Sequence, residues 1–226
     1  MISAILSAGE DEAGLAMTLA ALVPAATEGL IPDAIVVDGG QAAAAVIADA
    51  GGCGLVNGTG PEALRRAADE ARGDWLLFLP GGSVPEPTWQ AEAHAFIDRT
   101  VLAGDARRAA AVFRLARAKT GWRARRSEWL AALRLRVFAA PSAAQGLLVS
   151  RAAYRALGGH RPLPAMADVD LARRIGRRNL TVLRSRVFVG EGGDGRRGLG
   201  RSLRDAAVFL AFMLRLPAGV IGRLAA

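Results

Sequence analysis

The sequence predicts an α/β fold in which helices cover both faces of a mostly parallel central sheet. Four short apolar runs each end at a turn signal, and a helix pattern lies between each run and the next. The runs show little polar alternation, which is typical of strands buried on both faces. They are Ile2–Leu6, Ala34–Val37, Gly54–Val56 and Trp75–Leu79.

The helices between these strands are indicated by their ends. Asp11 opens the first helix, since acidic residues favour helix N-termini. The second, Gln41–Ala50, is rich in alanine and is closed by Gly51-Gly52. The third, Ala63–Ala71, follows Thr59-Gly60-Pro61-Glu62, which offers a capping hydroxyl with a glutamate three residues later.

The second half of the chain alternates less regularly. We expect strands at Ala110–Leu115 and Gln145–Ser150, and helices at Gln90–Ile97, Ser127–Phe138, Arg151–Leu157 and Asp168–Arg177. Gly158-Gly159 ends the third of these helices, and a glycine-rich loop spans Gly190–Gly200. Residues 1–198 are predicted to form one domain, and residues 199–226 a C-terminal amphipathic helical segment.

The fourth strand runs into Pro80-Gly81-Gly82. In α/β folds, ligands bind at the carboxyl ends of parallel strands, and Asp38 ends the second strand at the same edge. A glycine turn carries no reactive side chain at this edge. Its backbone N–H groups could approach a phosphate closely, whereas the simpler interpretation is a tight turn that has lost a site.

Charge divides the chain into an acidic first half and a basic second half. Residues 1–104 hold 4 Arg and 14 acidic residues, residues 105–136 hold 10 basic and 2 acidic residues, and residues 173–226 hold 12 and 3. This asymmetry favours an anionic partner, and a solvated arginine-rich surface is the alternative. Ala206–Leu214, flanked by arginines, predicts a helix that lies on an anionic membrane surface but is too short to span it.

Other partners and cofactors find little support. Cys53 is the only cysteine, and the N-terminus does not resemble a signal peptide, so we expect a cytoplasmic protein, peripheral on the inner face of the cytoplasmic membrane. His94 and His160 are isolated and form no metal-ligand spacing with Cys53, so no metal and no cofactor are expected. No nucleic-acid partner is expected, because the basic half lacks a recognisable reading motif. No feature indicates an oligomeric state.

Three segments, taken in order, resemble the family 2 glycosyltransferases of the GT-A fold, especially a small bacterial subgroup linked to cell-wall or arsenosugar biosynthesis. AIVVDGG is similar to the second strand of those enzymes, and ARGDWLLFLPGGSVPEPTW to the strand that carries their Asp-x-Asp metal site. QGLLVSRAAYRALGGHRPLPAMADVDLARRI is similar to a family strand, helix and Gly-Gly turn that lead to an acidic helix start. The similarity spans about residues 2–216 and implies a three-layer GT-A-like domain.

The resemblance also implies a chemistry, the inverting transfer of a sugar from a nucleotide-sugar donor. Asp38 would hold the nucleotide, and Asp168 would be the catalytic base that takes the acceptor's proton. The remaining donor-binding residues would be Ser7, Glu10, Gly81, Gly82 and Ser83, with Arg196 and Arg197 on the phosphates.

Several polar positions of the family are missing from this chain. The metal-binding Asp falls at Gly82, the first acid of the later motif is Ala167, and Gly9-Glu10 stands where the family usually has Asn-Glu. We therefore expect a metal-independent or weakly active transferase with an unknown acceptor, lipid-linked or in the cell envelope. The alternative is an inactive relative that binds a nucleotide, a sugar or another protein.

The two candidate acids also have structural interpretations. Asp38 could cap the next helix or brace a turn, as Asp often does before glycines. Asp168 could be the N-cap of the helix that follows it. Asp170, two residues later, is expected to face elsewhere on that helix.

Overall fold

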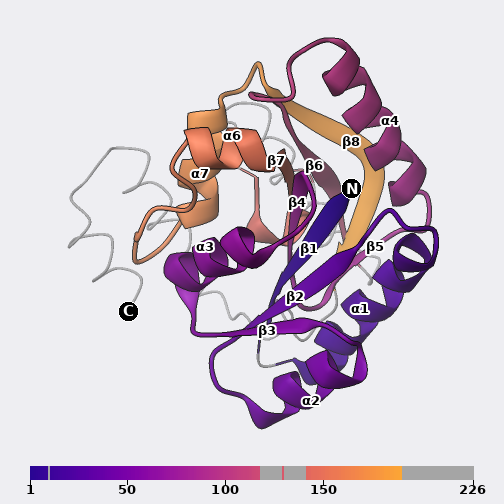
Figure 1. Cartoon of the computed structure of the whole chain (residues 1–226), viewed down its shortest axis with the longest axis vertical. Helices are drawn as coiled ribbons and strands as arrows, with labels where there is room; N and C mark the ends of the chain where they lie inside the picture. The colour runs from indigo at the N-terminus through magenta and orange to yellow at the C-terminus, as the bar shows by residue number, and fades with distance from the viewer. Residues whose placement is uncertain (10, 118–128, 130–140, 190–226) are drawn as a thin grey trace.

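The computed structural model describes residues 1–9, 11–117, 129 and 141–189. In this part of the chain, an eight-stranded sheet lies between two groups of helices, so the three-layer α/β prediction is confirmed (Figure 1). The strands are β1 (Ile2–Ser7), β2 (Asp33–Asp38), β3 (Gly54–Asn57), β4 (Trp75–Pro80), β5 (Ser83–Pro85), β6 (Ala110–Arg117), β7 (Leu147–Ser150) and β8 (Leu180–Val189). The helices are α1 (Glu12–Thr27), α2 (Ala42–Ala50), α3 (Gly60–Glu70), α4 (Trp89–Leu102), α6 (Arg151–Ala156) and α7 (Ala167–Ile175), with a 3₁₀ turn η1 at Ala143–Gln145.

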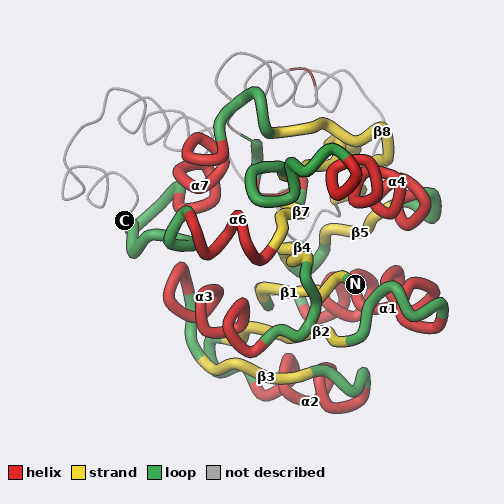
Figure 2. Tube along the Cα trace, turned by 45° about the horizontal axis from the view of Figure 1, so that its top comes forward, coloured by secondary structure: helices red, strands yellow, loops and turns green. Residues whose placement is uncertain are grey.

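The strand order is β3-β2-β1-β4-β7-β6-β8-β5, and Figure 2 shows its first five strands from β3 at the bottom up to β7. The first four strands are parallel, so the four strands predicted from the first 80 residues do share one sheet. Strand β7 is antiparallel to both of its neighbours, β4 and β6. Its N-terminal end therefore lies at the edge where β1, β2 and β4 end.

Two buried apolar clusters, one on each face of the sheet, form the core. Alternate residues of a strand point to opposite faces, and β1 shows the division: Ile2, Ala4 and Leu6 belong to one cluster and Ile5 to the other. The first cluster includes residues of α1, α2 and α4, and the second includes residues of α3, α6 and α7. Figure 1 shows these two sets of helices on opposite sides of the strands.

A bulge in β8 fixes α4 against the sheet. The pairing of β6 with β8 moves from Val112 with Val182 to Arg114 with Arg186, so β8 carries two extra residues there. The Glu92 carboxylate of α4 accepts hydrogen bonds from the backbone N–H groups of Arg184 (2.6 Å) and Ser185 (2.7 Å). Partial burial raises the pKa of Glu92, but hydrogen bonds from the Ser185 hydroxyl and these backbone groups lower it below its usual value overall.

Some sequence predictions change in detail. Thr59 is the N-cap of α3, but its hydroxyl makes no capping bond, and the Pro at the start of the helix is the signal that remains. Strands β5 and β8 were not predicted. Several predictions lie outside the described residues: the Ser127–Phe138 helix, the Gly190–Gly200 loop, the C-terminal segment, Glu10, Arg196 and Arg197. No helix in the described ranges is long and apolar enough to cross a membrane.

Candidate functional site

The carboxyl ends of the parallel strands bring several predicted residues to one edge. Ser7 pairs with Val37 on one side and with Pro80 on the other, and Asp38 follows Val37. Asp38 and the Pro80-Gly81-Gly82 turn therefore share an edge, as the sequence predicted. The N-terminal end of the antiparallel strand β7 lies at the same edge, since Leu147 pairs with Phe78.

A pocket of about 80 Å³ opens at this edge. Its walls come from the ends of β1, β4 and β7, from Leu64 of α3 and from residues 141–143. Most of the lining is apolar, and its polar side chains are those of Ser7, Ser142 and Asp168. Ligand pockets usually measure about 300–1,000 Å³, so this space is too small for a whole ligand of ordinary size.

Asp168 lies in the first turn of α7 and borders the pocket with a side chain that is 41% exposed. The helix begins at Ala167 after Met166, which has a φ of 62°, so the interpretation of Asp168 as the N-cap is wrong. The Asp168 Oδ1 atom lies 3.1 Å from Nε2 of His160. This contact leaves the carboxylate between a buried imidazole and the pocket.

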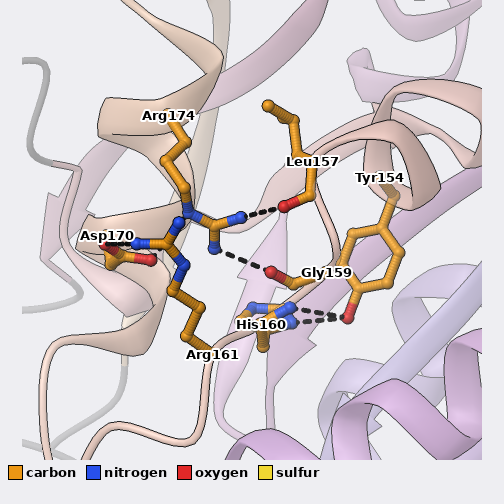
Figure 3. Close-up of polar contacts among 7 residues, drawn as sticks. All are labelled: Tyr154, Leu157, Gly159, His160, Arg161, Asp170 and Arg174. Atoms are coloured by element: carbon orange, nitrogen blue, oxygen red, sulfur yellow. Dashed lines mark hydrogen bonds and ion pairs between the residues drawn. The ribbon is translucent and has the colours of Figure 1, made fainter.

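His160 is fully buried, and its Nδ1 atom lies 2.8 Å from the hydroxyl of Tyr154 (Figure 3). Burial raises the pKa of Tyr154 to about 12, although the backbone N–H of His160 donates to its oxygen and opposes the shift. These two side-chain partners of His160 were not predicted from the sequence. The available signal was Gly158-Gly159, where the chain turns back between the tyrosine and the histidine.

Asp170 faces a different set of partners, as expected. Its carboxylate accepts from Nε of Arg174 at 2.7 Å and lies 3.8 Å from Nη1 of Arg161. Figure 3 shows Arg174 reaching in turn to the carbonyl oxygens of Leu157 and Gly159. Asp170 therefore orients an arginine that fastens the Gly158-Gly159 turn to α7.

Asp38 is 2% exposed and braces the turn that leads into α2. Its Oδ2 atom accepts from the backbone N–H groups of Gly40 (3.0 Å) and Gln41 (2.8 Å), which is the turn-bracing role considered above. Within the described residues, its buried Oδ1 atom has no hydrogen-bond partner. Buried polar atoms are nearly always paired, so a ligand donor would complete this carboxylate.

The glycine turn already uses its backbone donors. The N–H of Gly81 donates to the carbonyl of Ser7 at 2.9 Å, and that of Gly82 to Oγ1 of Thr18 at 3.0 Å. Ser83 is 1% exposed and pairs with Val189 as part of β5. This conformation therefore does not support the hypothesis that the N–H groups of Gly81 and Gly82 bind phosphate.

One carboxylate does lie beside this turn. Asp11 caps α1 through Oδ1, which accepts from the N–H of Gly14 at 3.0 Å, so its predicted role as a helix opener is confirmed. A Cβ built on Gly82 would lie 3.8 Å from its Oδ2 atom. Sequence reasoning did not connect Asp11 with the turn, because the contact depends on how α1 packs.

The described side chains at the turn offer a divalent cation one carboxylate, that of Asp11. Over the residues that the structure describes, no group of three or more His, Cys, Asp or Glu side chains could hold a metal ion. Calcium and magnesium ions need several oxygen ligands, and the turn offers the Asp11 carboxylate beside two glycines.

A larger pocket, of about 310 Å³, lies among α1, α2 and β2. Its lining is apolar apart from Cys53, whose thiol has a pKa raised by burial. Although it has more volume, it has no carboxylate or other group suited to acid–base chemistry. We therefore place the candidate chemistry at the smaller pocket, where Asp168 is.

No protein-family model matches the sequence, and no curated protein matches it. Solved structures do match. One is glucosyl-3-phosphoglycerate synthase from Mycobacterium tuberculosis in complex with Mn²⁺, UDP and glucosyl-3-phosphoglycerate, at 20% identity and a TM-score of 0.59, covering 96% of this chain and 81% of that one. The same enzyme with Mn²⁺ and UDP-glucose matches at 20% identity and a TM-score of 0.61, covering 96% and 80%. A further mycobacterial protein matches at 20% and 0.61, covering 96% and 76%. At these identities the likeness shows the fold alone, and the fold is that of the GT-A glycosyltransferase structures.

Proposed function

We propose that the protein is a glycosyltransferase that moves a sugar from a nucleotide-sugar donor to an acceptor hydroxyl, with inversion, using Asp168 as the general base. The observation that carries the proposal is the Asp168 carboxylate, which borders a pocket at the ligand-binding edge of the sheet. The fold likeness to an enzyme solved with UDP-glucose supports the class of donor.

In the proposed reaction, the carboxylate of Asp168 takes the proton of the acceptor hydroxyl. The acceptor oxygen forms a bond to the anomeric carbon, while the bond from that carbon to the diphosphate breaks and its electrons leave with the nucleoside diphosphate. A general base of this kind acts in the transition state, where the proton moves. The apolar walls of the pocket would exclude competing water.

The donor is proposed to lie along the same edge, with its nucleotide on Asp38. The unpaired Oδ1 of that residue suits an O–H or N–H donor of the ribose or the base. Ser7 borders the reacting end of the ligand. Gly81 and Gly82, which have no side chains, would let the donor lie close to the backbone without donating hydrogen bonds to it. Ser83, which is buried, would support the turn.

We propose that side chains, rather than a metal ion at Gly82, neutralise the charge of the diphosphate, because Gly82 stands where the family has its metal-binding Asp. We propose that Arg196 and Arg197 bind the phosphates and that Glu10 also contacts the donor. These three residues lie outside the described part of the chain.

The acceptor is proposed to be lipid-linked or part of the cell envelope. The basis is the charge pattern, since residues 105–136 and 173–226 together carry 22 basic and 5 acidic residues. Anionic lipid headgroups attract such segments. The segment 199–226, proposed as a unit separate from the domain of residues 1–198, would lie on the inner face of the cytoplasmic membrane.

A second candidate is a non-catalytic relative that binds a nucleotide, a sugar or another protein. It is favoured by the glycine turn, whose N–H groups are bonded within the chain and whose position lacks a carboxylate. Only the first candidate predicts product, and the second predicts donor binding only where its ligand is a nucleotide or a sugar.

A donor screen followed by two variants tests the proposal. UDP-glucose and other nucleotide sugars are screened by thermal shift, since a ligand at 100 times its Kd adds about 2.7 kcal/mol of stability. Asp168→Asn should lower kcat by about 10²–10⁴-fold with little change in donor affinity. Asp38→Ala should weaken donor binding first. Asp98→Asn, at an exposed aspartate of α4, is the control.

The outcomes separate the candidates. Donor binding without any product would favour the binding module. Turnover that survives Asp168→Asn unchanged would show that the base lies elsewhere.

A further inference from the structure

A chain of three side chains leads from the pocket into the core beneath α6 and α7. It runs from the Asp168 carboxylate to Nε2 of His160 (3.1 Å) and from Nδ1 of His160 to the Tyr154 hydroxyl (2.8 Å). Of the three, Asp168 alone is exposed: its side chain is 41% exposed, whereas His160 is 0% and Tyr154 is 4% exposed. The acid therefore faces the ligand, and the other two groups stand behind it.

The contacts assign the direction of each hydrogen bond. An ionised carboxylate can only accept, so Nε2 of His160 must carry the proton that faces Asp168. In a neutral imidazole, Nδ1 is then an acceptor, and it faces the Tyr154 hydroxyl. That oxygen also accepts from the backbone N–H of His160 at 3.3 Å, and its own proton donates to Nδ1 when the imidazole is neutral. Tyr154 therefore selects the tautomer that points a donor at Asp168.

The position of the imidazole is fixed on several sides. Gly158 and Gly159 have φ of 76° and 66°, which sharply turns the chain just before His160. Arg174 holds this turn through the carbonyls of Leu157 and Gly159 (Figure 3). The rings of His160 and Phe78 also pack in a T-shaped arrangement, with a centroid distance of 4.9 Å and an interplanar angle of 80°. Phe78 in turn lines the pocket.

We propose that His160, held in one tautomer by Tyr154, is a positioning residue that fixes the Asp168 carboxylate for proton transfer. Its Nε2–H holds Oδ1, and Oδ2, which no described residue bonds, is the oxygen left for the acceptor hydroxyl. The inference rests on the proposed function for its catalytic consequence. The orientation of Asp168 itself can be measured without any substrate.

Three variants separate hydrogen bonding from packing. His160→Phe keeps a ring against Phe78 but removes the donor. His160→Gln keeps a donor with a different shape, and Tyr154→Phe releases the choice of tautomer. The matched control is His94→Phe, because His94 also pairs with an aspartate, Asp98, at 2.9 Å, but on the exposed surface of α4.

The first measurement uses nuclear magnetic resonance on the ligand-free protein. The ring nitrogen shifts of His160 should show an Nε2–H tautomer, and three-bond couplings should show a single χ1 rotamer for Asp168. In His160→Phe these couplings should average over rotamers, and His160→Gln should restore most of the single-rotamer values. An Nδ1–H tautomer, or Asp168 couplings that are equal in wild type and His160→Phe, would overturn the proposal.

The second measurement follows UDP release from UDP-glucose. We expect His160→Phe to lower kcat about 10- to 100-fold with KM nearly unchanged. A loss of this size is typical when a residue that orients a metal-ligating side chain is removed. His160→Gln should recover part of the loss, and His94→Phe should have no effect. A loss in His160→Phe no larger than in His94→Phe would refute the catalytic consequence. Absence of turnover in the wild type would count against the proposed function for this donor, and the resonance measurement would then decide the positioning role.

Discussion

Tyr154 offers a quantitative test of how deeply the hydrogen-bonded side chains of Asp168, His160 and Tyr154 are buried. It is the only tyrosine in the sequence, so phenolate absorbance in the near ultraviolet reports on it alone. Burial raises its pKa from 10.0 to about 12 in the folded protein, whereas the unfolded chain should ionise it near 10.0. The folded state therefore holds the phenol proton more tightly than the unfolded state.

The sign of the stability change follows from this difference. Below pH 10 both states keep the proton, and the stabilisation is fully present. Between pH 10 and about 12 the unfolded chain loses the proton and the folded chain keeps it, so the free energy of unfolding falls as pH rises. A shift of two pKa units corresponds to about 3 kcal/mol over this window.

The assay compares wild type with Tyr154→Phe by urea unfolding from pH 8 to pH 11.5. At pH 8 the variant should be about 1–2 kcal/mol less stable, because His160 loses a buried hydrogen-bond partner. The difference should shrink and then reverse as pH rises. Cys53, whose thiol also has a pKa raised by burial, is present in both proteins, so its ionisation cancels.

The result that would refute this reasoning is specific. If phenolate absorbance in the folded protein rises with a midpoint near pH 10, Tyr154 is accessible to solvent and the hydrogen-bond chain is not closed. A stability difference that does not change with pH would lead to the same conclusion.

The remaining predictions concern the glycine turn and the basic segments. Gly82→Asp should destabilise the fold by about 1–2 kcal/mol, because φ at this position is +85° and the new carboxylate would lie near that of Asp11. Mn²⁺ should restore the lost stability by bridging the two carboxylates. Gly82→Asn is the uncharged control, and equal Mn²⁺ effects on the two variants would contradict the prediction. The full-length protein should sediment with anionic vesicles at low salt and be released at high salt, and failure to sediment at low salt would rule out the proposed membrane surface.

The strands that could be predicted are those whose sequences are continuous apolar runs, as is typical of strands buried on both faces. Trp75–Leu79 is a short apolar run that ends at Pro80-Gly81-Gly82, and the strand lies within a residue of the predicted bounds. Strand β8 buries Leu183, Ser185 and Val187, and the residues between them are Arg184 and Arg186. This short mixed pattern was not assigned as a strand. Strand β5 has three residues and a proline, too few to give a periodic signal.

The site could be predicted only in part. Asp168 and Ser7 do meet at one pocket, and Asp38 does lie at the same edge of the sheet. The bond between Asp168 and His160 could not be predicted, because it depends on how tightly the chain reverses at Gly158-Gly159. The contact of Thr18 with the N–H of Gly82 joins residues 64 apart in sequence, and only the packing of α1 brings them together.

The reversal at Gly158-Gly159 also has a consequence for the order in which the site assembles. Tyr154, His160 and Asp168 come from one short span, so little chain entropy is lost when they meet. The pocket wall needs Phe78 to pair with Leu147, a contact between distant parts of the chain that closes a large loop. We therefore expect the hydrogen-bonded acid to form early in folding and the pocket around it to form late. In partial unfolding the order would reverse, and the pocket would open while the acid kept its partners.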